Sequence, residues 1–410
     1  MSGTQENITK ERAITGLVPE ASIGAGGTPG RVWNLTSDAD PECTTEEVEI
    51  PDIRRDEFDN PSPDFGLQSW KWEPSFHIRA VTTKLNSGAS PSTPPNLKAL
   101  KALLGGEWAA AGSAVVADPA PTASEFAVTA THGGTRFKVN QWINVPVNGI
   151  AYPVPIKAIT DDLLTLAWEL PDAPATGAVV YNMYNYFYDS PNIKSLYLEH
   201  LKTDSANLQW KLFGGTGEFS WSGEYGKLLT YKAALTGPKY EEGALSLTNS
   251  YSADTQGGPF NFSQGDCFVL DPSSDTATKT TVTKITFKPK TGNVHLPEVT
   301  NTGAGGKSGI FRGDVRMPGD VEIQTPYDPA WRTTWAARPQ LRLGFTLSRG
   351  SGTSKQFACW HYPRAIIVGQ PRIIPDGNQN PLYHAFTLRA QIDPTGADKY
   401  AKNPMFFAVG

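Results

Sequence analysis

Alternation between apolar and polar residues from Leu208 to Glu242 constrains this chain more than any other feature. The apolar members of the segment are Leu208, Trp210, Leu212, Phe219 and Trp221, and the polar members are Gln209, Lys211, Glu218, Ser220 and Ser222. A period of two residues is typical of a strand with one buried and one solvated face. The segment contains no group of residues that would form a catalytic site, so it predicts a protein that works through its surfaces.

The same alternation predicts strands near Val48, over residues 70–79, over residues 341–347 and in the apolar C-terminal segment 403–410. Gly (39) and Pro (33) punctuate these runs, and eleven Trp with fourteen Tyr supply residues that favour strands. The predicted fold class is therefore all-β, with one flanking α-helix and an inserted small β module.

One segment has the period of a helix. It begins at Asn96, a good N-cap that follows two prolines, and Gly105 and Gly106 end it. Its apolar stripe consists of Leu97, Leu100, Leu103 and Leu104. An amphipathic helix of this kind is expected to cover the open end or a face of a sheet.

Changes in composition divide the chain into six segments. They are an N-terminal arm (1–45), a first part of the main domain (46–111), an inserted β module (112–185), a second part of the main domain (186–242), an extended loop or decoration (243–278) and a third part of the main domain (279–410).

The overall charge is nearly balanced, with 36 Lys and Arg against 41 Asp and Glu. This balance argues against a protein that binds nucleic acid tightly by neutralising phosphates, although nucleic acid could still move along the protein without being bound. The three cysteines are far apart and form no CxxC motif, which favours a reducing site of folding. The polar N-terminus does not resemble a signal peptide, and no apolar run approaches membrane-spanning length.

The possible chemical motifs favour structural interpretations. Gly214 to Gly217 is followed by a strand pattern rather than a helix, which favours a hairpin turn over a phosphate loop. Cys359, His361 and His384 lack a further ligand at matching spacing, so packing explains them better than metal binding. We therefore expect no catalytic residues, no cofactor site, no metal site and no enzymatic activity.

The order of several motifs carries a family resemblance. The DFG triplet at Asp64 precedes an amphipathic strand, TPPNLKALKALLGG begins the helix, and YNYFYDSPNIKSLYLE leads into the alternating segment at 208–242. The segments VTKITFKPKTGNVHLPEVT and HYPRAIIVGQPRIIP follow. This succession resembles the tail tube proteins of long-tailed bacteriophages and related gene-transfer particles. Residues 112–185 and 243–278 depart from the pattern.

The resemblance implies a tail-tube β-sandwich that assembles into homohexameric rings, which stack into the hollow tail tube of the virion. It also implies assembly in the host cytoplasm and contacts with the tape-measure, tail terminator and baseplate proteins. Double-stranded DNA would pass through the lumen without specific binding.

Two sets of residues then become candidate sites. The expected lumen face is the polar side of the alternating segment: Gln209, Lys211, Glu218, Ser220 and Ser222. The expected contacts between rings come from the arm before Val48, from the C-terminal strand and from the polar loop 84–95, which includes Lys84, Leu85, Asn86, Ser87 and Ser90.

Two other functions remain open. A minor tail or baseplate ring protein would share the fold and differ in copy number. A carbohydrate-binding or carbohydrate-cleaving β-sandwich is suggested by the many aromatic residues. However, Trp70, Trp72, Trp210 and Trp221 are expected on the apolar faces of their strands, where packing accounts for them.

Overall fold

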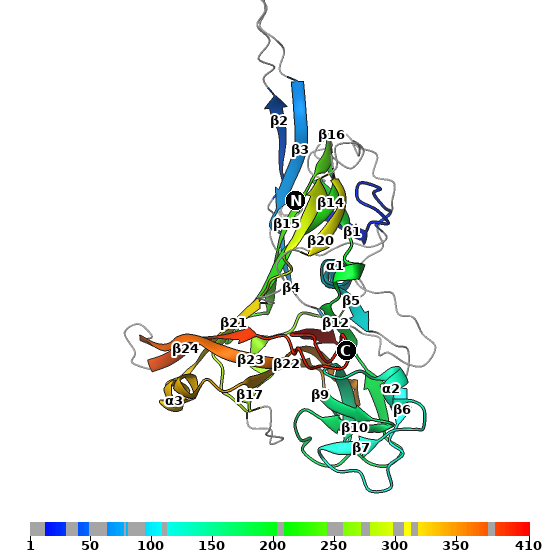
Figure 1. Ribbon diagram of the computed structural model, residues 1–410, viewed down its shortest axis with the longest axis vertical. Coiled ribbons are helices and arrows are strands. Elements are labelled where there is room, and N and C mark those ends of the chain that lie inside the picture. The colour runs from blue at the N-terminus through cyan, green and yellow to red at the C-terminus, as the bar shows by residue number, and fades with distance from the viewer. Residues whose placement is uncertain are drawn as a thin grey trace, which may run out of the picture.

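The computed structural model describes residues 13–29, 40–48, 64–77, 79–80, 95–108, 113–202, 209–243, 257–271, 279–297, 307–312, 319–375 and 382–410 (Figure 1). It is built mainly of antiparallel strands with few helices, which confirms the predicted all-β class. No helix within these ranges is both long and apolar enough to cross a membrane.

Two layers of strands enclose the main core. We call the first the front layer. Its strands, in order of pairing, are β4 (Ser75–His77), β15 (Thr230–Gly237), the second half of β14 (Gln209–Glu224), β18 (Lys284–Pro289), β21 (Gly319–Pro326), β24 (Leu382–Ala390) and the second half of β23 (Gln356–Pro375).

The second layer, which we call the back layer, lies against the front layer. Its strands are β17 (Gly265–Leu270), β22 (Leu341–Arg349), the first half of β23, β25 (Phe406–Val409), β12 (Tyr184–Tyr188) and β5 (Gly105–Trp108). Aromatic rings fill the space between the layers: the ring centroids of Phe287 and Trp360 are 5.0 Å apart, and those of Trp221 and Phe407 are 5.3 Å apart. The result is a sandwich whose core is predominantly aromatic.

A further group of strands extends the sandwich toward the top of Figure 1. Here β1 (Ala13–Pro19), β13 (Leu196–Lys202), the first half of β14 and β16 (Lys239–Gly243) form one sheet. A ribbon of β2 (Glu42–Val48) and β3 (Asp64–Trp72) pairs with β15, and β19 (Asn293–Pro297) pairs with β20 (Lys307–Arg312). The prediction of an arm over residues 1–45 is therefore wrong for β1 and for the start of β2, which are ladder strands.

The glycine cluster at 214–217 lies inside a strand, so the predicted hairpin turn is wrong. Strand β14 runs through the cluster and changes partners there, from β13 and β16 to β15 and β18. Gly214 has a φ of +69°, and a Cβ on Gly217 would collide with the carbonyl oxygen of Ala234. Only glycine accommodates this kink at low cost. The turn itself comes later, at Tyr225 and Gly226.

The predicted helix is confirmed as α1 (Pro95–Leu104), and all four leucines of its stripe, Leu97, Leu100, Leu103 and Leu104, are at most 2% exposed. It packs against β1, β5 and β12 in the main core. A second helix, α3 (Ala330–Ala337), was not predicted; its first free N–H, on Ala330, donates to the Asp328 carboxylate. The remaining helical segments are short: α2 (Gly133–Arg136), η1 (Ser190–Asn192), η2 (Phe262–Gln264) and η4 (Gly352–Ser354).

Residues 113–182 form a separate six-stranded sheet, which lies at the lower right of Figure 1. Its strands in spatial order are β6 (Ser113–Val115), β11 (Val179–Asn182), β8 (Trp142–Val147), β9 (Ile150–Thr160), β10 (Leu163–Leu166) and β7 (Glu125–Ala127). The apolar cluster of this module also includes Phe268, Phe357 and Phe406 of the back layer. The module therefore shares its core with the sandwich and covers the outer face of the back layer.

Two other expectations change. The segment 243–278 was interpreted as a loop or decoration, but its residues 265–270 form β17, which pairs with β22 inside the back layer. The C-terminal strand β25 is buried and paired on both sides, with β12 and β23 of the same chain. A strand held in this way cannot serve as a free connector between rings, so that part of the prediction is wrong.

Candidate functional surface on the front layer

The outer face of the front layer is a polar sheet surface that no other described element covers. Side chains from six strands meet on it in register. One row across the sheet consists of Thr230, Ser222, Thr286, Glu322 and Thr387. The next row consists of Glu224, Lys284, Gln324, Ala385 and Arg372. Because alternate residues point to the core, this face follows directly from the period of two in each strand.

Three cations of this face form ion pairs with neighbouring carboxylates. The Nζ of Lys232 lies 2.5 Å from Glu73, and that of Lys288 lies 2.6 Å from Glu322. The guanidinium of Arg389 donates two hydrogen bonds to Asp320, at 2.8 and 3.1 Å, and this contact raises the pKa of Arg389. A surface of this kind presents alternating charge without a concentrated positive field.

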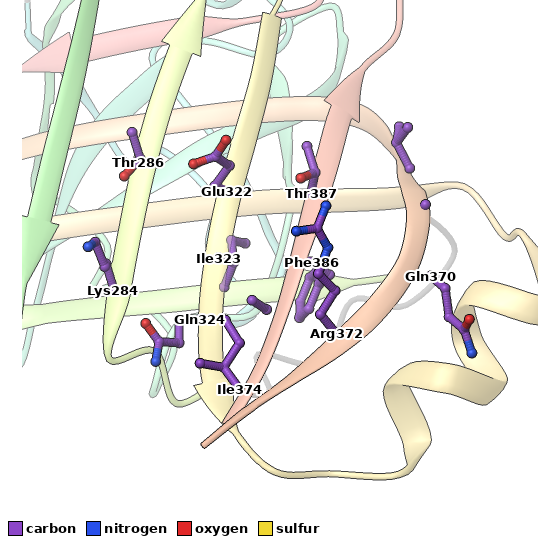
Figure 2. A pocket seen from close by; sticks show the side chains of 13 residues that line it. Lys284, Thr286, Glu322, Ile323, Gln324, Gln370, Arg372, Ile374, Phe386 and Thr387 are labelled. Carbon is purple, nitrogen blue, oxygen red and sulfur yellow. The ribbon is translucent and has the colours of Figure 1, made fainter. Parts of the chain in front are cut away.

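A shallow hollow of about 430 Å³ lies at one end of the face, where β23 leaves the ladder (Figure 2). Lys284, Gln324 and Arg372 contribute polar atoms to its wall, and Ile374 and Phe386 contribute apolar surface. The ladder between β23 and β24 shifts register between Val368 and Arg372, so the residues between them form a bulge.

The structure separates the predicted lumen residues into two groups. Glu218, Ser220 and Ser222 lie on the front face, exposed or half-buried. Gln209 and Lys211 lie beyond the kink, where they pair with β13 and β16 and are half-buried.

The reason for this separation is a change of parity. Trp210 and Leu212 are buried before the glycines, whereas Phe219 and Trp221 are buried after them. The buried side of β14 therefore changes from even-numbered to odd-numbered residues. By residue number alone, Gln209 and Lys211 fall on the side of the buried Phe219 and Trp221, opposite to Glu218, Ser220 and Ser222. The sequence contains this signal, because the two halves of the pattern are out of phase across the glycines.

The kink is held by polar groups that the sequence did not single out. The buried Glu20 carboxylate accepts hydrogen bonds from the N–H groups of Gly214 and Gly26, at 3.0 and 3.1 Å. Burial raises the pKa of Glu20, and its hydrogen bonds oppose that change. The ring Nε2 of His295 lies 2.7 Å from the carbonyl oxygen of Gly214. These contacts fix the angle between the two halves of β14.

The predicted contacts between rings at Lys84, Leu85, Asn86, Ser87 and Ser90 lie outside the described residues. The two histidines considered as metal ligands have separate hydrogen-bond partners. His361 donates from Nδ1 to the Asn140 carbonyl oxygen at 3.1 Å, and His384 accepts from the Asp328 N–H at 3.3 Å. Within the part of the chain that the structure describes, no three His, Cys, Asp or Glu residues group as metal ligands.

The four tryptophans that were expected on the apolar faces of their strands are buried. Trp70, Trp72, Trp210 and Trp221 are each at most 5% exposed, so none of them offers a flat surface to a sugar. Comparison with protein-family models and with curated proteins found no match.

Proposed function

We propose that this chain is the major subunit of a bacteriophage tail tube, in which homohexameric rings stack around a hollow channel. The observation that carries the proposal is the front face: a continuous polar surface, formed in register by several strands, with no covering element among the described residues. In the proposed assembly this face lines the channel. The order of the sequence motifs suggests the family, and the front face is a surface suited to line a channel.

The charge pattern of the face suits a channel for DNA. Phosphates bind tightly where cations are concentrated and free, because binding releases counterions. Here Lys232, Lys288 and Arg389 each lie against a carboxylate of the same face. DNA that passes this part of the wall meets paired cations and can slide, whereas Lys284 and Arg372 lie at the hollow at one end of the face.

The rest of the assembly follows from the same proposal. The channel holds the tape-measure protein during assembly and double-stranded DNA during delivery. Tail terminator and baseplate proteins close the two ends of the tube, and the subunit resides in the virion. The module 113–182 lies on the outer side of the back layer, away from the front face, and so decorates the outside of the tube.

Imaging of the purified protein tests the proposal. We expect negative-stain images of concentrated protein to show rings with a central hole, and stacks of these rings. Sedimentation velocity should show a monomer and an assembled species that exchange with concentration. A protein that remains monomeric in both measurements at every concentration, with and without the tape-measure protein, would overturn the proposal.

A further inference from the structure

Apolar side chains gather at the free end of the β23–β24 ribbon. Tyr327, Ile373, Ile374 and Leu382 meet at this end, where Tyr327 donates its N–H to the Leu382 carbonyl oxygen and Ile374 pairs with Tyr383. Ile374 points to the same face as Arg372, and Ile373 points to the other face of the ribbon. Each of the four is 39 to 46% exposed. We call this group the ribbon-end patch. Exposed apolar residues that cluster in this way mark contact sites more often than isolated ones do.

Exposed arginines lie on the α3 segment and at the hollow, whose lining also includes Glu322. Arg332 and Arg338 of the α3 segment are exposed, and so is Arg372, which also forms part of the hollow in Figure 2. None of the three arginines forms an ion pair with a described residue. Lys284 adds a further positive charge across the hollow. The occupant of this site should therefore combine an apolar side chain with carboxylates.

The edge of the ribbon does not suit simple strand addition. The bulge at residues 369–371 interrupts the ladder of β23, and Pro371 and Pro375 lack the N–H that a neighbouring strand would need. A partner is therefore recognised here through its side chains, which can enter the hollow, rather than through backbone hydrogen bonds.

A matching surface lies on the β2–β3 ribbon, at the top of Figure 1. Leu67 is 53% exposed and lies in a bulge of β3, where Gly66 and Leu67 together oppose Glu46 of β2. Glu46 is exposed opposite Leu67, and Glu42 is exposed on the same ribbon, where it pairs in register with the ribbon's single lysine, Lys71. This ribbon offers the apolar side chain and the carboxylates that the basic hollow requires.

We infer that the β2–β3 ribbon of one copy docks onto the ribbon-end patch and hollow of a second copy, with Leu67 against the apolar patch and Glu46 beside Arg372. The two surfaces differ and lie on different parts of the molecule, so the contact is head-to-tail. Repetition of a head-to-tail contact closes into a ring when the rotation allows. The inference rests on the proposed function and names the surfaces through which neighbouring subunits meet.

Charge reversal tests the contact. Arg372→Glu and Glu46→Arg place like charges together, and we expect each to weaken assembly at least about tenfold by sedimentation velocity. Mixing the two variants should restore assembly, because each contact in an alternating ring is then either native or fully reversed. The double variant in one chain should also assemble. Glu125→Lys, on the exposed module strand β7, is the matched control and should assemble normally.

The outcomes separate the two proposals. Normal assembly of Arg372→Glu and Glu46→Arg would overturn this contact and leave the tube function standing. Assembly lost in both variants and not restored by mixing would also overturn it. Circular dichroism and thermal unfolding of each variant exclude misfolding as the cause, since both side chains are exposed. A wild-type chain that never assembles would instead contradict the tube function itself.

Discussion

The outer faces of the front and back layers both arise from alternation of apolar and polar residues, but the front face is exposed to solvent and the back face is buried. On the front layer the alternate residues of β14, such as Ser220 and Ser222, meet solvent. On the back layer the alternate residues of β22, Arg342 and Thr346, are at most 8% exposed because the module lies over them. Alternation therefore shows which residues face away from the core. Whether those residues are exposed to solvent depends on whether another element packs on them.

The module packs closely against the back layer. A Cβ on Gly344 would collide with the Trp168 ring, and the Arg342 guanidinium donates to the Ala167 carbonyl oxygen at 2.6 Å. Trp168 stacks on Phe268 of the back layer, with 4.9 Å between ring centroids. The back face is part of a core, whereas the front face is free for a partner. The following predictions test this difference.

The largest effect is expected where the module meets the back layer. Trp168→Ala should lower the free energy of unfolding by about 3–5 kcal/mol, because it leaves a cavity beside Phe268. The matched change on the front face, Thr286→Ala, should stay within about 0.5 kcal/mol. Urea unfolding monitored by tryptophan fluorescence checks both. Equal losses for the two variants would show that the faces do not differ.

A pH effect is expected at the same contact. Burial and the nearby Arg342 lower the pKa of His361 to about 3, from an ordinary value of 6.5. The unfolded chain therefore binds more protons than the folded chain between these values. Stability is complete above pH 6.5 and is lost as the pH falls through this window, by about 2–3 kcal/mol at pH 4.5. His361→Gln should reduce this dependence; an unchanged pH profile in the variant would contradict the assignment.

A smaller effect is expected for an ion pair of the front face. Arg389 and Asp320 are both about one-third exposed, so solvent screens their attraction. Arg389→Ala should destabilise the protein by about 1 kcal/mol or less. Thermal unfolding at low and high salt checks this value. A loss as large as that of Trp168→Ala would mean that the front face is also a covered core.

The smallest effect on stability is expected for Glu322→Gln, which should instead change how strongly the assembled tube retains DNA. Glu322→Gln removes the partner of Lys288 and should alter stability by no more than about 0.5 kcal/mol. Assembled tubes of this variant should retain double-stranded DNA more strongly at low salt, with a salt slope that is steeper by about 0.9 for each cation freed. Retention identical to that of the wild type would place this face outside the channel.

The sequence predicted those parts of the fold that depend on local pattern. The leucine stripe of α1 and the alternation in β22 and in the second half of β14 are each set by residues a few positions apart. The cover over Arg342 and Thr346 was not predicted, because it depends on a module more than 150 residues away in the chain. Alternation in β22 alone cannot show that its polar side is buried.

Other errors had local signals that were given the wrong meaning. The glycines at 214–217 were interpreted as a turn, whereas the phase change between Leu212 and Phe219 indicates a continuous strand whose buried side switches. Asp328 followed by Pro329 is a typical helix start and would have indicated α3. The role of Glu20 had no such signal, because its partners at Gly26 and Gly214 come together only in the folded chain.

A cryo-EM reconstruction of the assembled protein tests the central claim most directly. The account predicts a tube in which Glu218, Ser220 and Ser222, with their neighbours on β18, β21 and β24, face the axis, and in which the module lies on the outside. A tube with the front face on its exterior, or with that face buried between stacked rings, would contradict the account.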